Sequence, residues 1–282
     1  SSNLADAEYT AGNTILSFNS DGFTCGDGAS VNANGVDYVS WNWKANGAGS
    51  ANTDGSINTT YTSANTTAGF SIIKYAGTGS SGTIGHGLSA TPKVLIIKEI
   101  DGTESWRVWN RDAPNYSTKA LSLNSSSAEF SQTNWIGTVD NSIITLGTDS
   151  SINTSGNNYI CYAFAEKQGF SKFSSYTGNG NNDGSFIYTG FSTAFVMTKN
   201  IGATENWAIW DNKRIPFNAN TTILRADSAN AETSGYSVDF VSNGFKLRGG
   251  DGKINGTGAS YIYMAFAEAP IVGTNNIPAN AR

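Results

Sequence analysis

The side chains with the strongest potential for chemistry are few in this sequence, and they are scattered along it. The only histidine is His86, in the segment GHGL, and the two cysteines are Cys25 and Cys161. Nucleophilic hydrolysis needs a serine or cysteine beside a histidine, and a structural zinc site needs cysteines and histidines at close, paired spacings. The sequence shows neither pattern. We therefore expect two free thiols, and an imidazole that is a polar group on the surface of a loop.

Asparagine, aspartate and glycine gather in three loops, GDGASVNANG, GNGNNDG and GGDGKING. Their oxygen atoms are of the kind that binds calcium, which makes Asp183 and Asp251 weak calcium candidates. None of the loops has the EF-hand spacing, and the same residue types form tight turns without any ion. We favour turns over a metal site here, and we expect no cofactor.

Two pairs of tryptophans have the same spacing, Trp106 and Trp109 in ESWRVWN, and Trp207 and Trp210 in ENWAIWD. Successive side chains of a strand point to opposite faces, so the two members of each pair lie on opposite sides of a strand. The first member of each pair shares its side with an aliphatic residue. We therefore expect Trp106 and Trp207 to face a core.

The second members, Trp109 and Trp210, would then face outward or into an interface, Trp109 beside Arg107. An exposed tryptophan can stack on a sugar ring or anchor a protein interface. These three residues are the candidates for contact with a receptor or partner. The alternative is that a loop of a large sandwich covers both indoles.

The tryptophan pairs belong to a repeat of about 100 residues. YICYAFAE at 159–166 returns as YIYMAFAE at 261–268, VLIIK at 94–98 matches FVMTK at 195–199, and a third, partial copy contains YVSWNWKA from Tyr38. Repeats of this length are typical of tandem domains, because solenoid and propeller repeats run about 20–50 residues. We expect half a module at 1–45, a linker at 46–68, modules at 69–168 and 169–270, and an extension at 271–282. Preceding chain or another subunit should supply the missing front half, since half a module cannot bury its apolar face.

Within each unit, short runs rich in β-branched and aromatic residues alternate with clusters of glycine, asparagine, aspartate and serine. These are strand and turn signals, and no window has the periodicity of an amphipathic helix. About seven short strands in each 100 residues predict an all-β fold. We expect tandem antiparallel β-sandwich modules of jelly-roll or lectin-like type.

The repeated phrase reads as a strand with two different faces. Ile160, Tyr162 and Phe164 form a large apolar face, and the aligned copies are also large and apolar there, with Val39, Trp41 and Trp43, and with Ile262, Met264 and Phe266. We expect this face to pack into the core of a sandwich. Glu166 and Glu268 recur at the end of the phrase, but Ala45 stands there in the first copy. We interpret the two glutamates as solvated charges and not as catalytic carboxylates.

Composition excludes several classes of partner. Charged residues make up 14% of the chain, and the net charge of −5 is spread along it without a basic cluster. Counterion release from a nucleic acid and attraction to anionic lipid both need such a cluster, and no apolar run approaches the roughly 20 residues of a spanning helix. We expect neither nucleic acid nor membrane insertion.

The sequence of the repeat resembles that of a known group of proteins. The segment GNNYICYAFAEKQGFSKFSSYTGNGNNDGSFIYTGF, together with YVSWNWKANG and ASYIYMAFAEAP, is similar to tandem β-rich repeat proteins of tailed bacteriophages, especially phages of marine bacteria. The resemblance implies a virion structural protein, of the tail fibre or tail-associated kind, on the surface of an extracellular particle. It implies other virion proteins as partners and no catalytic residues.

Three function classes follow. The first is a fibre or appendage component that contacts a host glycan or outer-membrane protein. The second is a purely architectural capsid decoration or connecting tail protein. The third, a tail-borne glycan depolymerase, needs paired carboxylates that the repeats do not offer, so we expect no enzyme. Fibres of this kind are often homo-oligomers such as trimers, but no heptad pattern fixes the number of subunits.

Overall fold

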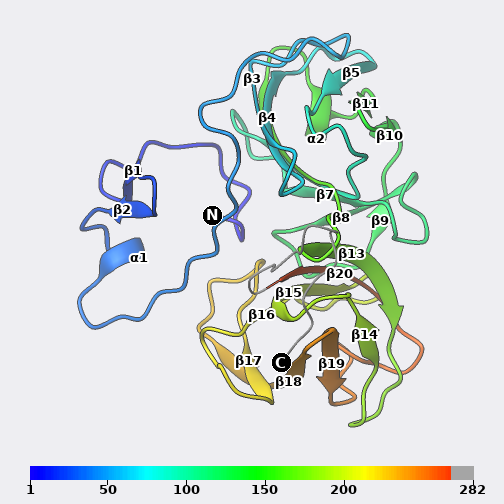
Figure 1. Cartoon of the computed structure of the whole chain (residues 1–282). Coiled ribbons are helices and arrows are strands. Elements are labelled where there is room, and N and C mark those ends of the chain that lie inside the picture. Colours follow the sequence, from blue (N-terminus) through cyan, green and yellow to red (C-terminus); the bar gives the residue numbers. More distant parts are fainter. Residues whose placement is uncertain (268–282) are drawn as a thin grey trace.

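Antiparallel strands make up nearly all of the regular structure, as the short β-branched and aromatic runs predict. The computed structural model describes residues 1–267 (Figure 1). The expected extension at 271–282 and Glu268 lie outside the described residues. Within the described part, the helices are the single turns α1 (Ala29–Asn32) and α2 (Ser150–Asn153), and no helix there is long and apolar enough to span a membrane.

The first module is a sandwich of two antiparallel sheets. Its inner sheet has the order β3-β4-β12-β6-β7-β8-β9, and its outer sheet the order β10-β11-β5. The bounds are β3 (Tyr61–Asn65), β4 (Phe70–Ala76), β5 (Gly82–Gly85), β6 (Val94–Glu99), β7 (Arg107–Asn110), β8 (Lys119–Ser122), β9 (Phe130–Ser131), β10 (Ile136–Val139), β11 (Ile143–Leu146) and β12 (Asn158–Phe164).

The second module repeats this topology. Its inner sheet, β13-β20-β15-β16, has the order of β4-β12-β6-β7, and its outer sheet, β14-β19-β18-β17, repeats β5-β11-β10 with one strand added. The bounds are β13 (Ser171–Thr177), β14 (Phe186–Tyr188), β15 (Thr193–Asn200), β16 (Ala208–Asp211), β17 (Asn220–Ile223), β18 (Thr233–Val241), β19 (Gly244–Arg248) and β20 (Ser260–Ala267). The all-β antiparallel prediction is confirmed.

The repeated phrase forms an interior strand of each inner sheet. β12 pairs with β4 on one side and with β6 on the other, and β20 lies in the same way between β13 and β15. A strand with two partners has all its backbone groups in ladders, so its repetition reflects a structural position.

Both faces of the inner sheets are buried, which corrects the expected assignment of faces. Tyr159, Cys161 and Ala163, on the side without the large aliphatic residues, belong to the first module's own core between its two sheets. Phe164, on the large apolar face, belongs to a different core that both modules share. The prediction assumed a single buried face, but each inner sheet packs between its own outer sheet and the neighbouring module.

The same geometry corrects the tryptophan assignment. Trp109 lies in the core of the first module and Trp210 in that of the second, with exposed fractions of 2% and 0%. Trp207 is buried in the shared core, and Trp106 packs against that core at its edge. The expected opposition of the two members within each pair holds, but neither Trp109 nor Trp210 faces outward.

Residues 1–45, which we call the arm, contain β1 (Ile15–Phe18), β2 (Phe23–Cys25) and α1. The arm has the local structure of the back half of a module. Tyr38 Oη donates to Ala29 O (2.6 Å) and accepts from Ala33 N (3.0 Å). Tyr159, which lies 121 residues further on, makes the equivalent bonds to Ser150 O and Thr154 N, and Tyr261 repeats them in the second module.

Residues 38–45 differ from their counterparts β12 and β20, because they form no strand. The strands that flank β12 come from the front half of its module, and the described chain has no such half for the arm. Trp41 and Trp43 pack against the shared core instead.

The segment at 46–68, expected as a linker, is part of the first module. β3 pairs with β4 along its whole length, and Ser50 bridges to Thr62. Polar composition concealed this strand because an edge strand is held mainly by backbone hydrogen bonds and can carry polar side chains.

The three units follow one another by a repeated contact. Glu8 N donates to Ile100 O (2.8 Å) between arm and first module, and the equivalent Glu129 N donates to Ile201 O (2.8 Å) between the two modules. Figure 1 shows the arm, the first module and the second module as three lobes around a central region. The chain is therefore built of three related units that meet at a common centre.

Candidate functional site

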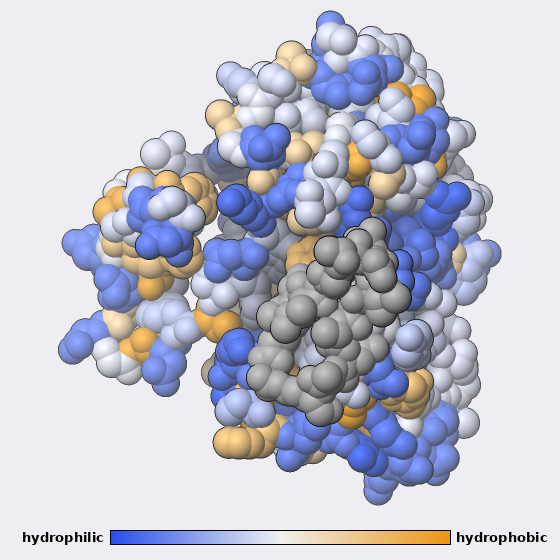
Figure 2. Space-filling view, in the orientation of Figure 1, coloured by the Kyte–Doolittle hydropathy of each residue, from blue (hydrophilic) through white to orange (hydrophobic). Residues whose placement is uncertain are grey.

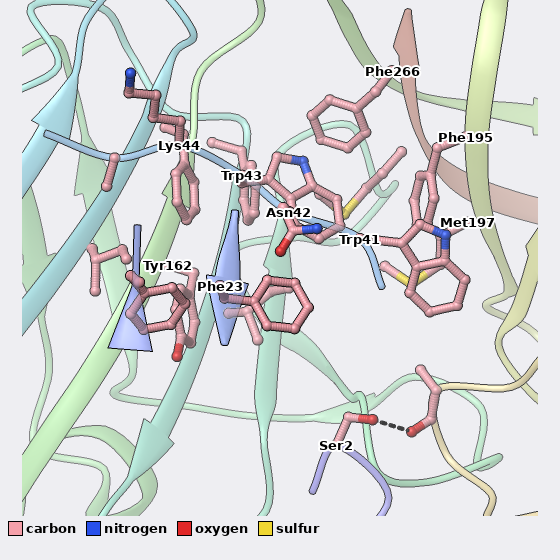
Figure 3. Close-up of a pocket in the computed structure, with 18 of the residues that line it drawn as sticks. Ser2, Phe23, Trp41, Asn42, Trp43, Lys44, Tyr162, Phe195, Met197 and Phe266 are labelled. Atoms are coloured by element: carbon pink, nitrogen blue, oxygen red, sulfur yellow. Dashed lines mark hydrogen bonds between the residues drawn. The ribbon is translucent and has the colours of Figure 1, made fainter. Parts of the chain in front are cut away.

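A deep apolar groove of about 1590 Å³ lies at this centre, between the arm and the two inner sheets. Its walls come from the β1–β2 turn, from residues 41–48, and from strands of both modules. Figure 3 shows Trp41 and Trp43 from the arm beside Phe195, Met197 and Phe266 of the second module, with Tyr162 of the first module across the groove.

Aromatic rings from equivalent positions of the three units meet in the groove. Trp43, Phe164 and Phe266 occupy the same place in the repeated phrase. Their centroids are 6.3 Å apart for Trp43 and Phe164, 5.4 Å for Trp43 and Phe266, and 6.1 Å for Phe164 and Phe266, all in edge arrangements. Such pairs contribute about 0.5–1.5 kcal/mol each beyond their buried area. This cluster, which we call the aromatic junction, connects all three units.

Polar contacts fix the arm against the modules around the aromatic junction. Trp41 Nε1 donates to Asp211 Oδ2 (3.3 Å), and Ser2 Oγ donates to Ala226 O (2.8 Å, Figure 3). On the other side, Trp106 Nε1 donates to Leu4 O (3.1 Å). The arm thus bonds to both modules.

The lining suits packing of apolar groups better than proton transfer. Among the described residues that line the groove, the charged ones are Asp21, Lys44 and Arg225, and the rest are mainly aromatic and aliphatic. A groove of this kind binds apolar side chains or an aromatic surface. Trp41 and Trp43 were predicted as core residues of the arm's own module. Their signal as junction residues was that they align with large apolar residues of both modules, Trp43 with Phe164 and Phe266, while their half-module lacks partner strands.

The structure does not bring the predicted contact residues together at a surface. A loop covers Trp109, whose ring meets Tyr116 at 5.6 Å, so the alternative of a covering loop is the one observed for this residue. Trp210 Nε1 donates to Tyr236 O (2.9 Å) inside the second module. Arg107 donates to Ser122 Oγ (3.1 Å) and lies 5.1 Å over the ring of Phe130. All three are engaged within the chain.

The two calcium candidates lie in different environments. Asp183 is exposed and pairs with Lys246 Nζ (2.7 Å) and Arg248 Nη1 (3.4 Å), and the hydrogen bond from Lys246 lowers its pKa. Asp251 forms a turn, accepting from Lys253 N (2.8 Å) through its side chain. No group of three or more histidine, cysteine, aspartate or glutamate side chains within residues 1–267 could hold a metal ion.

Glu166 is not a simple solvated charge. It pairs with Lys93 (3.4 Å) and Lys172 (3.2 Å) and accepts from Phe173 N (3.0 Å). Because Lys93 belongs to the first module and the other two residues to the second, Glu166 ties the modules together.

His86 is buried, so the prediction of a surface imidazole is wrong. Its Nδ1 accepts from Leu88 N (3.2 Å), which leaves Nε2 to carry the proton and donate to Asp140 O (3.2 Å). Burial lowers its pKa, against the opposing effect of the bond to Asp140. Thr189, its counterpart in the second module, is also buried and accepts from Phe191 N. The imidazole therefore orders a turn.

Comparison with known proteins places the whole described chain in one family. Residues 1–270 match the domain of unknown function DUF7483. The chain belongs to the DUF7483 family. No curated protein and no solved structure matches it.

Proposed function

We propose that this DUF7483 chain is a structural component of a bacteriophage virion, in a tail fibre or appendage at the particle surface. The observation that carries the proposal is the aromatic junction, in which the repeated face of all three units serves to pack the units on one another. The assignment to a phage particle rests on the resemblance of the repeated segments to proteins of tailed bacteriophages. This packing holds the three units together and involves neither a substrate nor a cofactor. It therefore supports a structural role.

Locating the chain in intact particles tests the proposal. Antibodies raised against residues 1–282 should label tail appendages in electron micrographs of phages that carry this sequence. Label confined to the capsid shell would support the purely architectural alternative and contradict the fibre assignment. Absence of the chain from purified particles would contradict both, and release of sugar fragments from host polysaccharide by the purified chain would favour the depolymerase alternative.

Contact with a host receptor needs a surface other than the buried tryptophans. Phe186 and Tyr188 in β14 alternate with the buried Ile187 and are 50% and 62% exposed on the same side of the outer sheet. Lys246 pairs with Phe186 in the ladder, and its ion pair with Asp183 adds polar groups beside the rings. Aromatic rings flanked by polar groups suit a sugar or a protein anchor. We place the proposed host contact here.

The matched test uses exposed aromatic residues in two places. The double variant Phe186→Ser, Tyr188→Ser should reduce binding of the labelled chain to cells of the host by at least about tenfold, since hot-spot residues contribute 2 kcal/mol or more. Phe217→Ser, at a 77% exposed residue elsewhere on the second module, is the control and should bind unchanged. Equal binding of both variants would remove β14 from the proposal.

A further inference from the structure

The arm has the hydrogen-bonded framework of a back half without its burial. Phe18 is 85% exposed where its counterpart Val139 is 8% exposed, and Tyr38 is 46% exposed where Tyr159 is fully buried. The turn α1 has no buried residue, whereas α2 has three. Figure 2 shows the resulting apolar colouring over the arm. The arm's own core positions therefore lack the layer that covers them in the two complete modules.

A polar group in the arm shows the same deficit. Asn153 accepts from Thr78 N (2.8 Å), and its counterpart Asn255 accepts from Asn179 N (3.0 Å), each bond joining a back half to its front half. Asn32 is the equivalent in the arm, and it keeps the internal bond from its amide to Gly26 O (2.9 Å). Within residues 1–267 its side-chain oxygen accepts no hydrogen bond. The missing donor is a backbone N–H at the start of a turn.

The backbone hydrogen bond that joins one unit to the next also lacks its third copy. Glu8 N and Glu129 N each donate to the carbonyl of an isoleucine in the next unit's front half, Ile100 directly after β6 and Ile201 directly after β15. Glu232 is the third equivalent, and its amide has no such backbone partner among the described residues. A front half in the arm would offer that carbonyl and close the ring of three.

The groove has the character of the space that such a half would occupy. In the first module, the front half sends Val94, Ile96 and Val108 into the shared core, and in the second it sends Phe195, Met197 and Ile209. From the arm, Trp41, Trp43 and Ala45 pack against that core, and all three belong to a back half. The apolar groove of about 1590 Å³ opens between these residues and both inner sheets.

We propose that a third front half, of the type of residues 69–121, completes the arm and fills this groove, and that it is joined to Ser1 in the same polypeptide. In both complete modules the front half directly precedes its back half in the same polypeptide, and a front half ahead of the arm would repeat that order. Copies of the described chain cannot supply it to one another, because each has three back halves and two front halves.

The inference is independent of the virion assignment and can be tested on the chain itself. Cys25 aligns with Leu146, which is fully buried, yet Cys25 is only half-buried. Residues 69–121 fused ahead of Ser1 should bury Cys25 and slow its alkylation by N-ethylmaleimide at least about tenfold, since protected groups react through opening of the structure. Cys161, already fully buried, serves as the internal reference.

The matched control carries Ile73→Asp and Leu95→Asp in the added copy only, because both residues belong to a module's own core. This control should leave Cys25 as reactive as in residues 1–282. Equal reactivity in the intact fusion would overturn the proposal. If the fusion is insoluble, the mass of the natural polypeptide decides: a mass equal to residues 1–282 overturns the covalent source, and an extension before Ser1 at least as long as residues 69–121 supports it.

Discussion

At the scale of single residues, side chains that the sequence predicts at a surface are buried inside a module. His86, Trp109 and Trp210 were each expected to meet solvent or a partner, and each is enclosed by its own module. A sequence gives the alternation of a strand but not the number of layers packed on it, so it could separate Trp106 from Trp109 without showing that both sides are covered. In the same way, a lone histidine in a loop carries no signal of the outer sheet that covers it.

His86 predicts a pH dependence of stability. Its folded pKa is lowered, so the neutral form is favoured in the folded state, and protonation of Nδ1 removes the acceptor of Leu88 N. Stability should be full above the unfolded pKa of about 6.5 and should be lost as pH falls from there through the folded pKa. Asp140 and Asp54 are the charged groups that oppose this shift.

The measurement is the melting temperature between about pH 7.5 and 5.5, where histidine is the side chain that ordinarily titrates. His86→Thr places the second module's residue in the first and should flatten the profile in this window. A variant that loses stability as steeply as the parent chain would contradict the assignment.

The two buried indoles predict unequal costs of truncation. Trp210 Nε1 donates to Tyr236 O, whereas Trp109 Nε1 is buried without a partner. Trp210→Phe leaves a carbonyl unpaired, and Trp109→Phe removes an unpaired donor. We expect Trp210→Phe to reduce the free energy of unfolding by about 1–2 kcal/mol more than Trp109→Phe in urea titrations. Equal losses would show that packing and not hydrogen bonding sets both costs.

At the scale of elements, the strands were predictable and their environments were not. The runs that form β6, β12, β15 and β20 are rich in β-branched and aromatic residues and are bounded by turn residues. The repeat predicts that corresponding strands follow one another in the same order along both modules. β3 has the composition of a linker, because Asn, Ser and Thr fill it and its surroundings. The face of β12 was assigned by size, which fails when the larger side chains serve the junction between modules and the smaller ones the module's interior.

The tyrosine that repeats at the start of this strand predicts a contrast between complete and incomplete units. Tyr159→Phe should cost about 1–3 kcal/mol, because Thr154 N and Ser150 O lose the hydroxyl of a fully buried tyrosine as their partner. Tyr38→Phe should cost less than about 0.5 kcal/mol, because water reaches the exposed equivalent. Urea unfolding of both variants measures the difference, and a large cost at Tyr38 would mean that the arm is already enclosed.

At the scale of the whole molecule, the number and order of units could be predicted from the repeat, but their meeting point could not. Alignment shows that Trp43, Phe164 and Phe266 are equivalent without showing that they touch. Contacts between units arise from the rotation that relates them, and a sequence period carries no information on that rotation.

The contacts of Trp43 lead us to expect that this side chain stabilises the binding of the arm to the two modules. Trp43→Ala removes edge contacts with Phe164, Phe195 and Phe266. Loss of about 1.4 kcal/mol corresponds to a tenfold larger population of released arm. Limited proteolysis within residues 1–45 should accelerate at least about tenfold while the two modules stay resistant. Tyr9→Ala, at a 71% exposed residue of the arm, is the control and should cleave at the parent rate.

The repeated contact from Glu8 to Ile100 and from Glu129 to Ile201 has a consequence for symmetry. Most threefold assemblies form from three identical chains, and they dissociate on dilution. Lobes on a single chain stay together at any concentration, because the linkage keeps their effective concentration high. They are also free to differ, as β17 and the exposed rings of β14 already do in the second module. A partner bound at the centre of the three lobes would then contact three different surfaces. It could bind in one of its three rotational orientations in preference to the other two.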